Sequence, residues 1–215
     1  MYAMMDALGF YVMDEADVEC HYNWINQSDH LSNKESWSPQ FVDRNVRMVK
    51  RDRNHPSVIF WSLGNESGDG VCFTNAYQAV KALDTERPIH YEGSYNHGYS
   101  NGLGTELKKN SDLYSDMYPN YNAIKGKLAG YDSKPYFICE YEHAMGQSVG
   151  NLKDDWNLIE GSTGIIGGCI WDWVDQAIYQ TNSSSGVVEN KTDANGFHYW
   201  TAGYDYNKAN DNYAQ

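Results

Sequence analysis

The sequence predicts an α/β fold built on a parallel β-sheet, and three observations predict it. Short apolar runs alternate with longer amphipathic segments along the whole 215-residue chain, as they do when crossover helices connect parallel strands. Several of these runs are apolar without alternation, which is typical of strands buried on both faces. Hydrophobic residues make up 41% of the chain, so it can bury one substantial core as a single globular unit.

Each expected element has its own pattern. The six apolar runs that qualify as strands are residues 10–13, 58–63, 89–92, 113–117, 137–140 and 167–171. The amphipathic segments long enough for crossover helices are residues 39–51, 73–83 and 152–160. Residues 1–8 have the pattern of a helix that precedes a strand, and the Ser- and Gly-rich residues 182–196 predict a polar loop.

Residues of the kinds used in catalysis and sugar binding cluster at the carboxyl ends of these strands. They are Asp14, Glu15, Asn65, Glu66, Tyr118, Glu140 and Trp171. In a (β/α)8 barrel, the carboxyl ends of the strands carry the active site, and a complete barrel takes about 250 residues. We therefore expect residues 1–215 to form a truncated TIM-barrel catalytic domain, a partial (β/α)8 barrel with about six of eight strands, that starts at the helix before the third barrel strand.

The charge and the cysteines exclude several classes of protein. A net charge of -13 opposes binding to nucleic acid or to an anionic membrane. No stretch is long and apolar enough to cross a bilayer, and the first residues lack the basic start of a signal peptide. Cys20, Cys72, Cys139 and Cys169 are widely spaced, which favours a reducing compartment. We therefore expect a cytoplasmic location.

A pair of glutamates is the strongest functional signal. Glu66 follows one short apolar run and Glu140 ends another. A retaining glycosidase uses one carboxylate as nucleophile and a second, about 5 to 5.5 Å away, as acid and then base. The chain is also 14% aromatic, and aromatic rings bind the apolar faces of sugars as well as filling protein cores. The pair therefore predicts a glycoside hydrolase.

Four segments resemble the β-galactosidases of glycoside hydrolase family 2. They are DEADVECH at 14–21, DRNHPSVIFWSLGNESG at 52–68, CEYEHAMGQSVGN at 139–151 and GGCIWDWVDQ at 167–176. The resemblance is loosest at residues 95–112 and after residue 180, and it covers the later part of that family's catalytic barrel. It implies double-displacement hydrolysis of terminal β-D-galactose residues from β-galactosides such as lactose.

The resemblance also implies roles for single residues. By it, Glu140 is similar to the nucleophile and Glu66 to the acid/base. The substrate-binding residues that it implies are Asn65, Met117, Tyr118, His143 and Trp171. A phenol from Tyr118 that donates a hydrogen bond to Glu140 is expected to keep that carboxylate ionised. We expect Trp173, close to Trp171, to pack in the core.

The resemblance also implies a metal-binding site. Glu19 and His21 are two residues apart, so on an extended segment their side chains point to the same side. The resemblance implies that Glu19, His21 and Glu66 bind Mg²⁺. It also implies Na⁺ in the intact enzyme, for which no ligand is assigned in this chain.

Two alternatives stay open at this point. A family 2 β-glucuronidase or β-mannosidase also has an Asn-Glu at one strand end and a Glu at another. The chain is alternatively a subunit or segment that is inactive without its missing parts. The expected partners are a β-galactoside and either N-terminal domains or a second chain, in a homo- or hetero-oligomer.

Overall fold

The computed structural model describes residues 1–20, 30–94, 110–129, 134–143 and 150–173, together with residues 180–181, 188–189, 191–192, 195 and 198–199. It divides into two compact units. The first unit comprises Met1–Tyr141 and Asn151–Ile170, and the second comprises Glu142–Gly150 and Trp171–Gln215. The sheet and its helices lie in the first unit.

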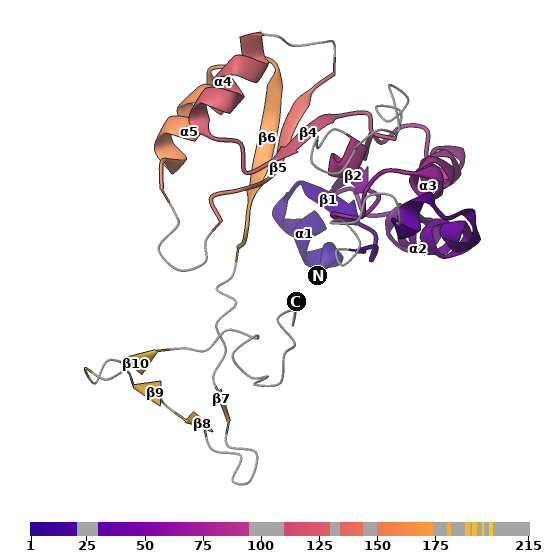
Figure 1. Cartoon of the computed structure of the whole chain (residues 1–215), viewed down its shortest axis with the longest axis horizontal. Helices are drawn as coiled ribbons and strands as arrows, with labels where there is room; N and C mark the ends of the chain where they lie inside the picture. Colours follow the sequence, from indigo (N-terminus) through magenta and orange to yellow (C-terminus); the bar gives the residue numbers. More distant parts are fainter. Residues whose placement is uncertain are drawn as a thin grey trace. The chain divides into compact units, whose positions relative to one another are not determined.

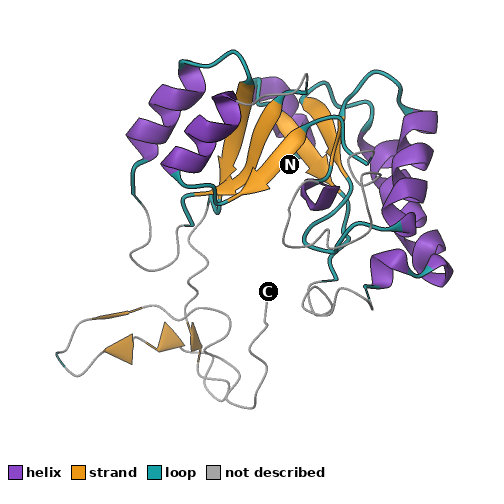
Figure 2. Cartoon of the chain, turned by 45° about the horizontal axis from the view of Figure 1, so that its top comes forward, coloured by secondary structure: helices purple, strands orange, loops and turns teal. Residues whose placement is uncertain are grey.

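The described part of the first unit contains six parallel strands (Figure 2). They are β1 (Val12–Glu15), β2 (Val58–Ser62), β3 (Ile89–His90), β4 (Tyr114–Met117), β5 (Tyr136–Tyr141) and β6 (Ile165–Ile170). They form two three-stranded sheets, in the orders β1-β2-β3 and β4-β5-β6. All six strands were predicted, with bounds that differ by a few residues. A partial parallel barrel is therefore confirmed.

The helices of the first unit lie on the outer side of these strands. They are α1 (Tyr2–Leu8), α2 (Ser38–Asp52), α3 (Val71–Leu83), α4 (Tyr121–Ala129) and α5 (Leu152–Glu160), with the short 3-10 turns η3 (Leu31–Asn33), η4 (Glu35–Trp37) and η5 (Glu92–Ser94). In Figure 1, α2 and α3 lie beside β1 and β2, whereas α4 and α5 lie beside β4 to β6. The helix α4 was not predicted from the sequence.

Two hydrophobic clusters explain this arrangement. The helix α2 buries Phe41, Met48 and Val49 on one face, at the spacing of an amphipathic helix. Phe41 meets Phe73 of α3 edge to face, with ring centroids 5.1 Å apart. This first cluster covers β1 to β3. The second cluster joins α4 and α5 to β5 and β6 around the fully buried Ile124 and its neighbours.

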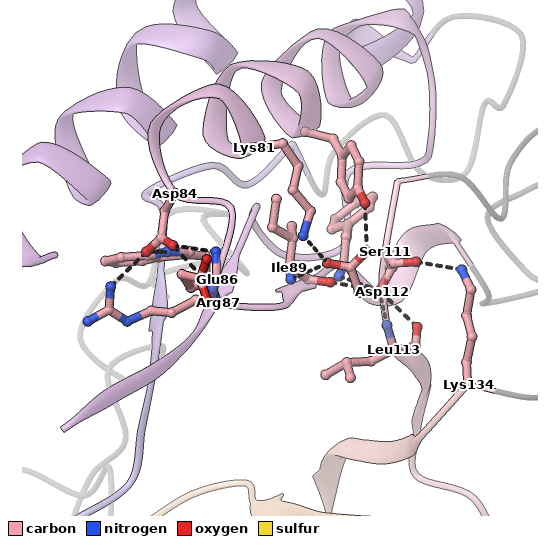
Figure 3. Close-up of polar contacts among 12 residues, drawn as sticks. Lys81, Asp84, Glu86, Arg87, Ile89, Ser111, Asp112, Leu113 and Lys134 are labelled. Atoms are coloured by element: carbon pink, nitrogen blue, oxygen red, sulfur yellow. Dashed lines mark hydrogen bonds and ion pairs between the residues drawn. The ribbon is translucent and has the colours of Figure 1, made fainter. Parts of the chain in front are cut away.

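A polar network joins the two sheets where β3 and β4 begin (Figure 3). The backbone N–H of Asp112 donates to the carbonyl of Ile89 at 2.7 Å. In return, the carboxylate of Asp112 accepts from the backbone N–H of Ile89 and from Lys81, both at 2.8 Å. Lys134 donates to the carbonyl of Ser111 at 2.7 Å. These contacts stabilise the amino ends of the strands, away from the carboxyl ends where a barrel carries its catalytic residues.

The described residues of the second unit include two short antiparallel pairs. One pairs β7 (Gln180–Thr181) with β8 (Val188–Glu189), and the other pairs β9 (Lys191–Thr192) with β10 (His198–Tyr199). The prediction of a polar loop over residues 182–196 was therefore wrong for β8 and β9, because strands of two residues are too short to show a periodic pattern. Among the described residues, no helix has the length and apolar character needed to cross a membrane.

Candidate active site

The loop that carries Glu66 follows β2 in a fixed and unusual conformation. Gly64 has φ +147, and a Cβ there would lie 2.6 Å from the carbonyl oxygen of Val18. The next residue, Asn65, donates its backbone N–H to that same carbonyl at 2.9 Å. Glu66 then adopts φ 40, a left-handed conformation that is uncommon for any residue but glycine. The loop therefore sets the direction of the Glu66 side chain.

Glu140 and Tyr118 come together across two neighbouring strands. Glu140 lies in β5 in register with Met117 of β4. Tyr118 follows β4 with φ 48 and donates its backbone N–H to the carbonyl of Glu140 at 2.7 Å. Its phenol donates to Oε2 of Glu140 at 2.5 Å. The predicted contact between these two side chains is thus present.

The charge state of Glu140 differs from the expectation. Burial raises the pKa of Glu140 to about 7, although the hydrogen bond from Tyr118 lowers it. The negative charges of Glu66, Glu15 and Glu19 raise it further. The effect expected of the phenol is therefore real but smaller than the effect of burial. The charge of Glu66 affects both Glu140 and Tyr118, so the two glutamates predicted to be catalytic lie close enough for their charges to interact.

Glu19 lies alongside the loop that carries Glu66. It forms an isolated parallel bridge with Asn65. The next backbone N–H, of Cys20, donates to Oγ of Ser67 at 2.7 Å. Two carboxylates on adjoining segments suit a hard cation such as Mg²⁺. The third predicted ligand, His21, lies outside the described residues, and within them no group of three His, Cys, Asp or Glu side chains is arranged to hold a metal.

His143 and Trp171 belong to the second unit. Their predicted contacts with the sugar therefore stay predictions, as do those of Asn65 and Met117. Trp173 is 90% exposed. Its predicted core position is wrong, because no described residue packs over the indole.

A chain of hydrogen bonds crosses β1 to β4 beneath these carboxylates, and the sequence analysis missed it. Oγ of Ser62 donates to Oε2 of Glu15 at 2.6 Å. With its one hydrogen used, Ser62 accepts from Nδ1 of His90 at 2.9 Å, and Nε2 of His90 accepts from Ser115 at 2.7 Å. Burial lowers the pKa of His90 to about 3, so a neutral imidazole with its proton on Nδ1 satisfies every bond.

Two further residues were missed, both directly after β3. Tyr91 and Glu92 are 0% and 1% exposed and contact the loop that carries Glu66. Burial raises the pKa of Glu92 well above its usual range. The available signal was their position, since they follow a strand as Asn65 and Glu66 do. Both lie inside the apolar strand predicted over residues 89–92, so no functional role was predicted for them.

Comparisons with known proteins agree with this architecture. Residues 1–212 match the family described as "Glycosyl hydrolases family 2, TIM barrel domain". The β-galactosidases of Pseudoalteromonas haloplanktis and Pectobacterium atrosepticum are each 36% identical to the chain over 211 residues, which is 95% of this chain and 19% of each relative. The chain thus spans about a fifth of the length of these relatives.

Solved structures show the same fold at lower identity. A glycosyl hydrolase family 2 member from Bacteroides cellulosilyticus has a TM-score of 0.52 and 22% identity, covering 79% of this chain and 21% of that chain. The β-glucuronidase of Ruminococcus gnavus in complex with uronic deoxynojirimycin has a TM-score of 0.54 and 16% identity, covering 80% and 35%. By sequence and by fold, the chain belongs to glycoside hydrolase family 2 and forms part of its TIM barrel domain.

Proposed function

We propose that this chain supplies the two catalytic carboxylates of a retaining β-galactosidase, with Glu140 as nucleophile and Glu66 as acid/base. The observation that carries the proposal is the pairing of Glu140 with Tyr118 within reach of the charge of Glu66. A phenol that donates to a carboxylate holds one of its oxygens and leaves the other to attack the anomeric carbon. A second carboxyl close by protonates the leaving oxygen and then activates water.

The curated relatives favour galactose over a uronic acid as the substrate: the two β-galactosidases are each 36% identical to the chain over 95% of its length. Rates on aryl galactosides, glucuronides and mannosides would separate the three substrates.

Two variants of the complete natural gene product test the assignment of roles. Glu140→Gln removes the nucleophile, so turnover of lactose and of an aryl galactoside should both fall on the order of 10⁴-fold or more. Glu66→Gln removes proton donation, so lactose should lose roughly 10²- to 10⁴-fold in rate. Measured as kcat/KM, which reports only the steps up to the glycosyl-enzyme, an aryl galactoside should lose much less, because its phenolate leaves with little protonation.

The matched control is Glu160→Gln, an exposed carboxylate at the end of α5. It should leave both rates unchanged. Equal losses on both substrates in Glu66→Gln, or a covalent glycosyl-enzyme on a residue other than Glu140, would contradict the assignment.

We further propose that Glu19, His21 and Glu66 hold Mg²⁺ in the active enzyme, which supplies positive charge among these carboxylates. The support is the bridge between Glu19 and Asn65, which brings the Glu19 segment beside Glu66. Chelation should lower turnover, and added Mg²⁺ should restore it. In Glu19→Gln, restoration should need a higher Mg²⁺ concentration than in the Glu86→Gln surface control; an unchanged requirement would contradict Glu19 as a ligand.

A further inference from the structure

The loop that carries Glu66 is held by two adjacent residues that follow a different strand, β3. The backbone N–H of Glu66 donates to Oε1 of Glu92 at 2.6 Å. The next N–H, of Ser67, donates to the hydroxyl of Tyr91 at 3.3 Å. That hydroxyl in turn donates to the carbonyl of Gly68. Three consecutive residues of the loop are therefore fixed by two side chains that follow β3.

The two holding residues are themselves rigidly placed. Tyr91 stacks on Phe73 of α3, with ring centroids 3.8 Å apart. A Cβ on Gly93 would lie 2.5 Å from the Tyr91 ring, so the glycine leaves room for the ring. Glu92 is 1% exposed, and its Oε2 has no hydrogen-bond partner within the described part of the chain. Its carboxyl accepts from the backbone N–H groups of Glu66 and of Gly93.

The hydrogen bond from Glu66 to Glu92 stabilises an unusual backbone conformation. Glu66 adopts φ 40, and a non-glycine residue keeps such a conformation only where its surroundings impose it. The N–H of Glu66 points into a buried region, where an unpaired donor is unfavourable. An acceptor at the position of Oε1 of Glu92 satisfies the donor and favours this backbone conformation over extended ones. The direction of the Glu66 carboxyl depends on that conformation.

We propose that Tyr91 and Glu92 are positioning residues that aim Glu66 at the glycosidic oxygen. The inference rests on the proposed acid/base role of Glu66. Neither residue needs to contact the substrate. Their loss would misplace the proton donor and leave the nucleophile Glu140, on β5, in its place.

Proton donation matters most for a basic leaving group, so the test compares two substrates in the complete gene product. Glu92→Leu keeps the size of the side chain and removes the acceptor. It should lower kcat/KM for lactose roughly 10- to 100-fold, since a displaced catalytic group costs up to about 10²-fold. An aryl galactoside with an acidic phenol should lose no more than about threefold, because it needs little protonation.

Two milder variants keep the test decisive if Glu92→Leu does not fold. Glu92→Gln retains an oxygen acceptor and should stay within about threefold of the parent on both substrates. Tyr91→Phe keeps the stacked ring and removes only the hydroxyl. Like Glu92→Leu, it should lower kcat/KM more for lactose than for the aryl galactoside, but by a smaller factor. The matched control is Tyr77→Phe, which removes another tyrosine hydroxyl bond, partly buried and made to Asp112 at the opposite end of the strands. Its ratio of the two rates should be unchanged.

The outcomes separate the two proposals. Suppose that Glu66→Gln lowers kcat/KM more for lactose than for the aryl galactoside. If Glu92→Leu and Tyr91→Phe then each lower kcat/KM equally for the two substrates, the positioning role is wrong. The positioning role is also wrong if Glu92→Gln loses as much as Glu92→Leu. If Glu66→Gln itself lowers kcat/KM equally for the two substrates, the acid/base assignment is wrong, and the inference is lost with it.

Discussion

At the scale of single residues, opposing interactions determine the protonation state of Glu140. Burial and three neighbouring carboxylates favour its protonated form, and the hydrogen bond from Tyr118 favours the ionised form. Because the net result is a pKa of about 7, Glu140, the proposed nucleophile, is partly protonated at neutral pH. Any group that changes this balance should change the pH dependence of catalysis.

Tyr118→Phe tests this balance. It removes the one contact among these that lowers the pKa of Glu140, so that pKa should rise. Because the nucleophile reacts only when ionised, the acidic limb of the profile of kcat/KM against pH should then shift to higher pH. Activity at pH 6 should fall roughly tenfold more than activity at pH 8, since a hydrogen bond to a charged group contributes about 1.5–3 kcal/mol. Tyr121→Phe, an exposed tyrosine on α4, is the control. An unshifted limb, or a shift to lower pH, would contradict the argument.

At the scale of elements, the sequence predicted the strands well, for a physical reason. A parallel strand buried on both faces is a short apolar run whatever its neighbours are, as in VIFWS of β2. The helix α4 has no such local signal, because its sequence YNAIKGKLA mixes polar and apolar residues and includes a glycine. Ile124 of this helix becomes buried through contacts with β5 and α5, which lie far along the chain.

The candidate site shows the same division. Glu66 and Glu140 could be predicted because each ends or follows an apolar run and lies in a segment that resembles a known family. For Tyr91 and Glu92 the sequence offers only their position after a strand, since their contacts are hydrogen bonds to residues about 25 positions away. The hydrogen bonds that connect Glu15, Ser62, His90 and Ser115 likewise could not be predicted, because they depend on which side chains face each other across neighbouring strands.

The hydrogen-bonded chain predicts how the elements respond to pH. An unfolded histidine has a pKa of about 6.5, whereas the folded pKa of His90 is about 3. Between these values the unfolded state binds a proton that the folded state does not, so stability from His90 is complete above pH 6.5 and is lost as pH falls toward 3. The loss is roughly 1.4 kcal/mol per pH unit at most.

The measurement is hydrogen exchange of peptides from β2 and β3, corrected for the intrinsic effect of pH. Protection should fall between pH 7 and pH 5 in the parent protein and fall less in His90→Gln. Comparing the two cancels the contributions of other titrating groups. An equal fall in both proteins would show that His90 is not held neutral by the chain from Glu15 to Ser115.

At the scale of the whole molecule, the described strands of the first unit leave an outer edge of each three-stranded sheet unpaired. In the described residues, β1 pairs with β2 alone and β6 with β5 alone. The helix α1 buries no residue, and Met1, Met4, Leu8 and Phe10 are exposed. Unpaired strand edges beside an apolar surface bind further protein or aggregate.

These open edges predict that the 215-residue chain by itself does not turn over lactose. It should bind a hydrophobic dye strongly and form oligomers of several sizes in size-exclusion chromatography, because unpaired strand edges and exposed apolar surface associate. Co-expression with the parts of the Pseudoalteromonas haloplanktis β-galactosidase that lie outside its matching region should reduce dye binding, because they would cover the exposed edge at β1 and the apolar surface of α1. Activity should then appear in the joint complex, and Glu140→Gln in this chain should remove it, which excludes a contribution from other galactosidases in the host. Turnover by the chain alone, at a rate lost in Glu140→Gln, would contradict the argument and show that six strands suffice to form the site.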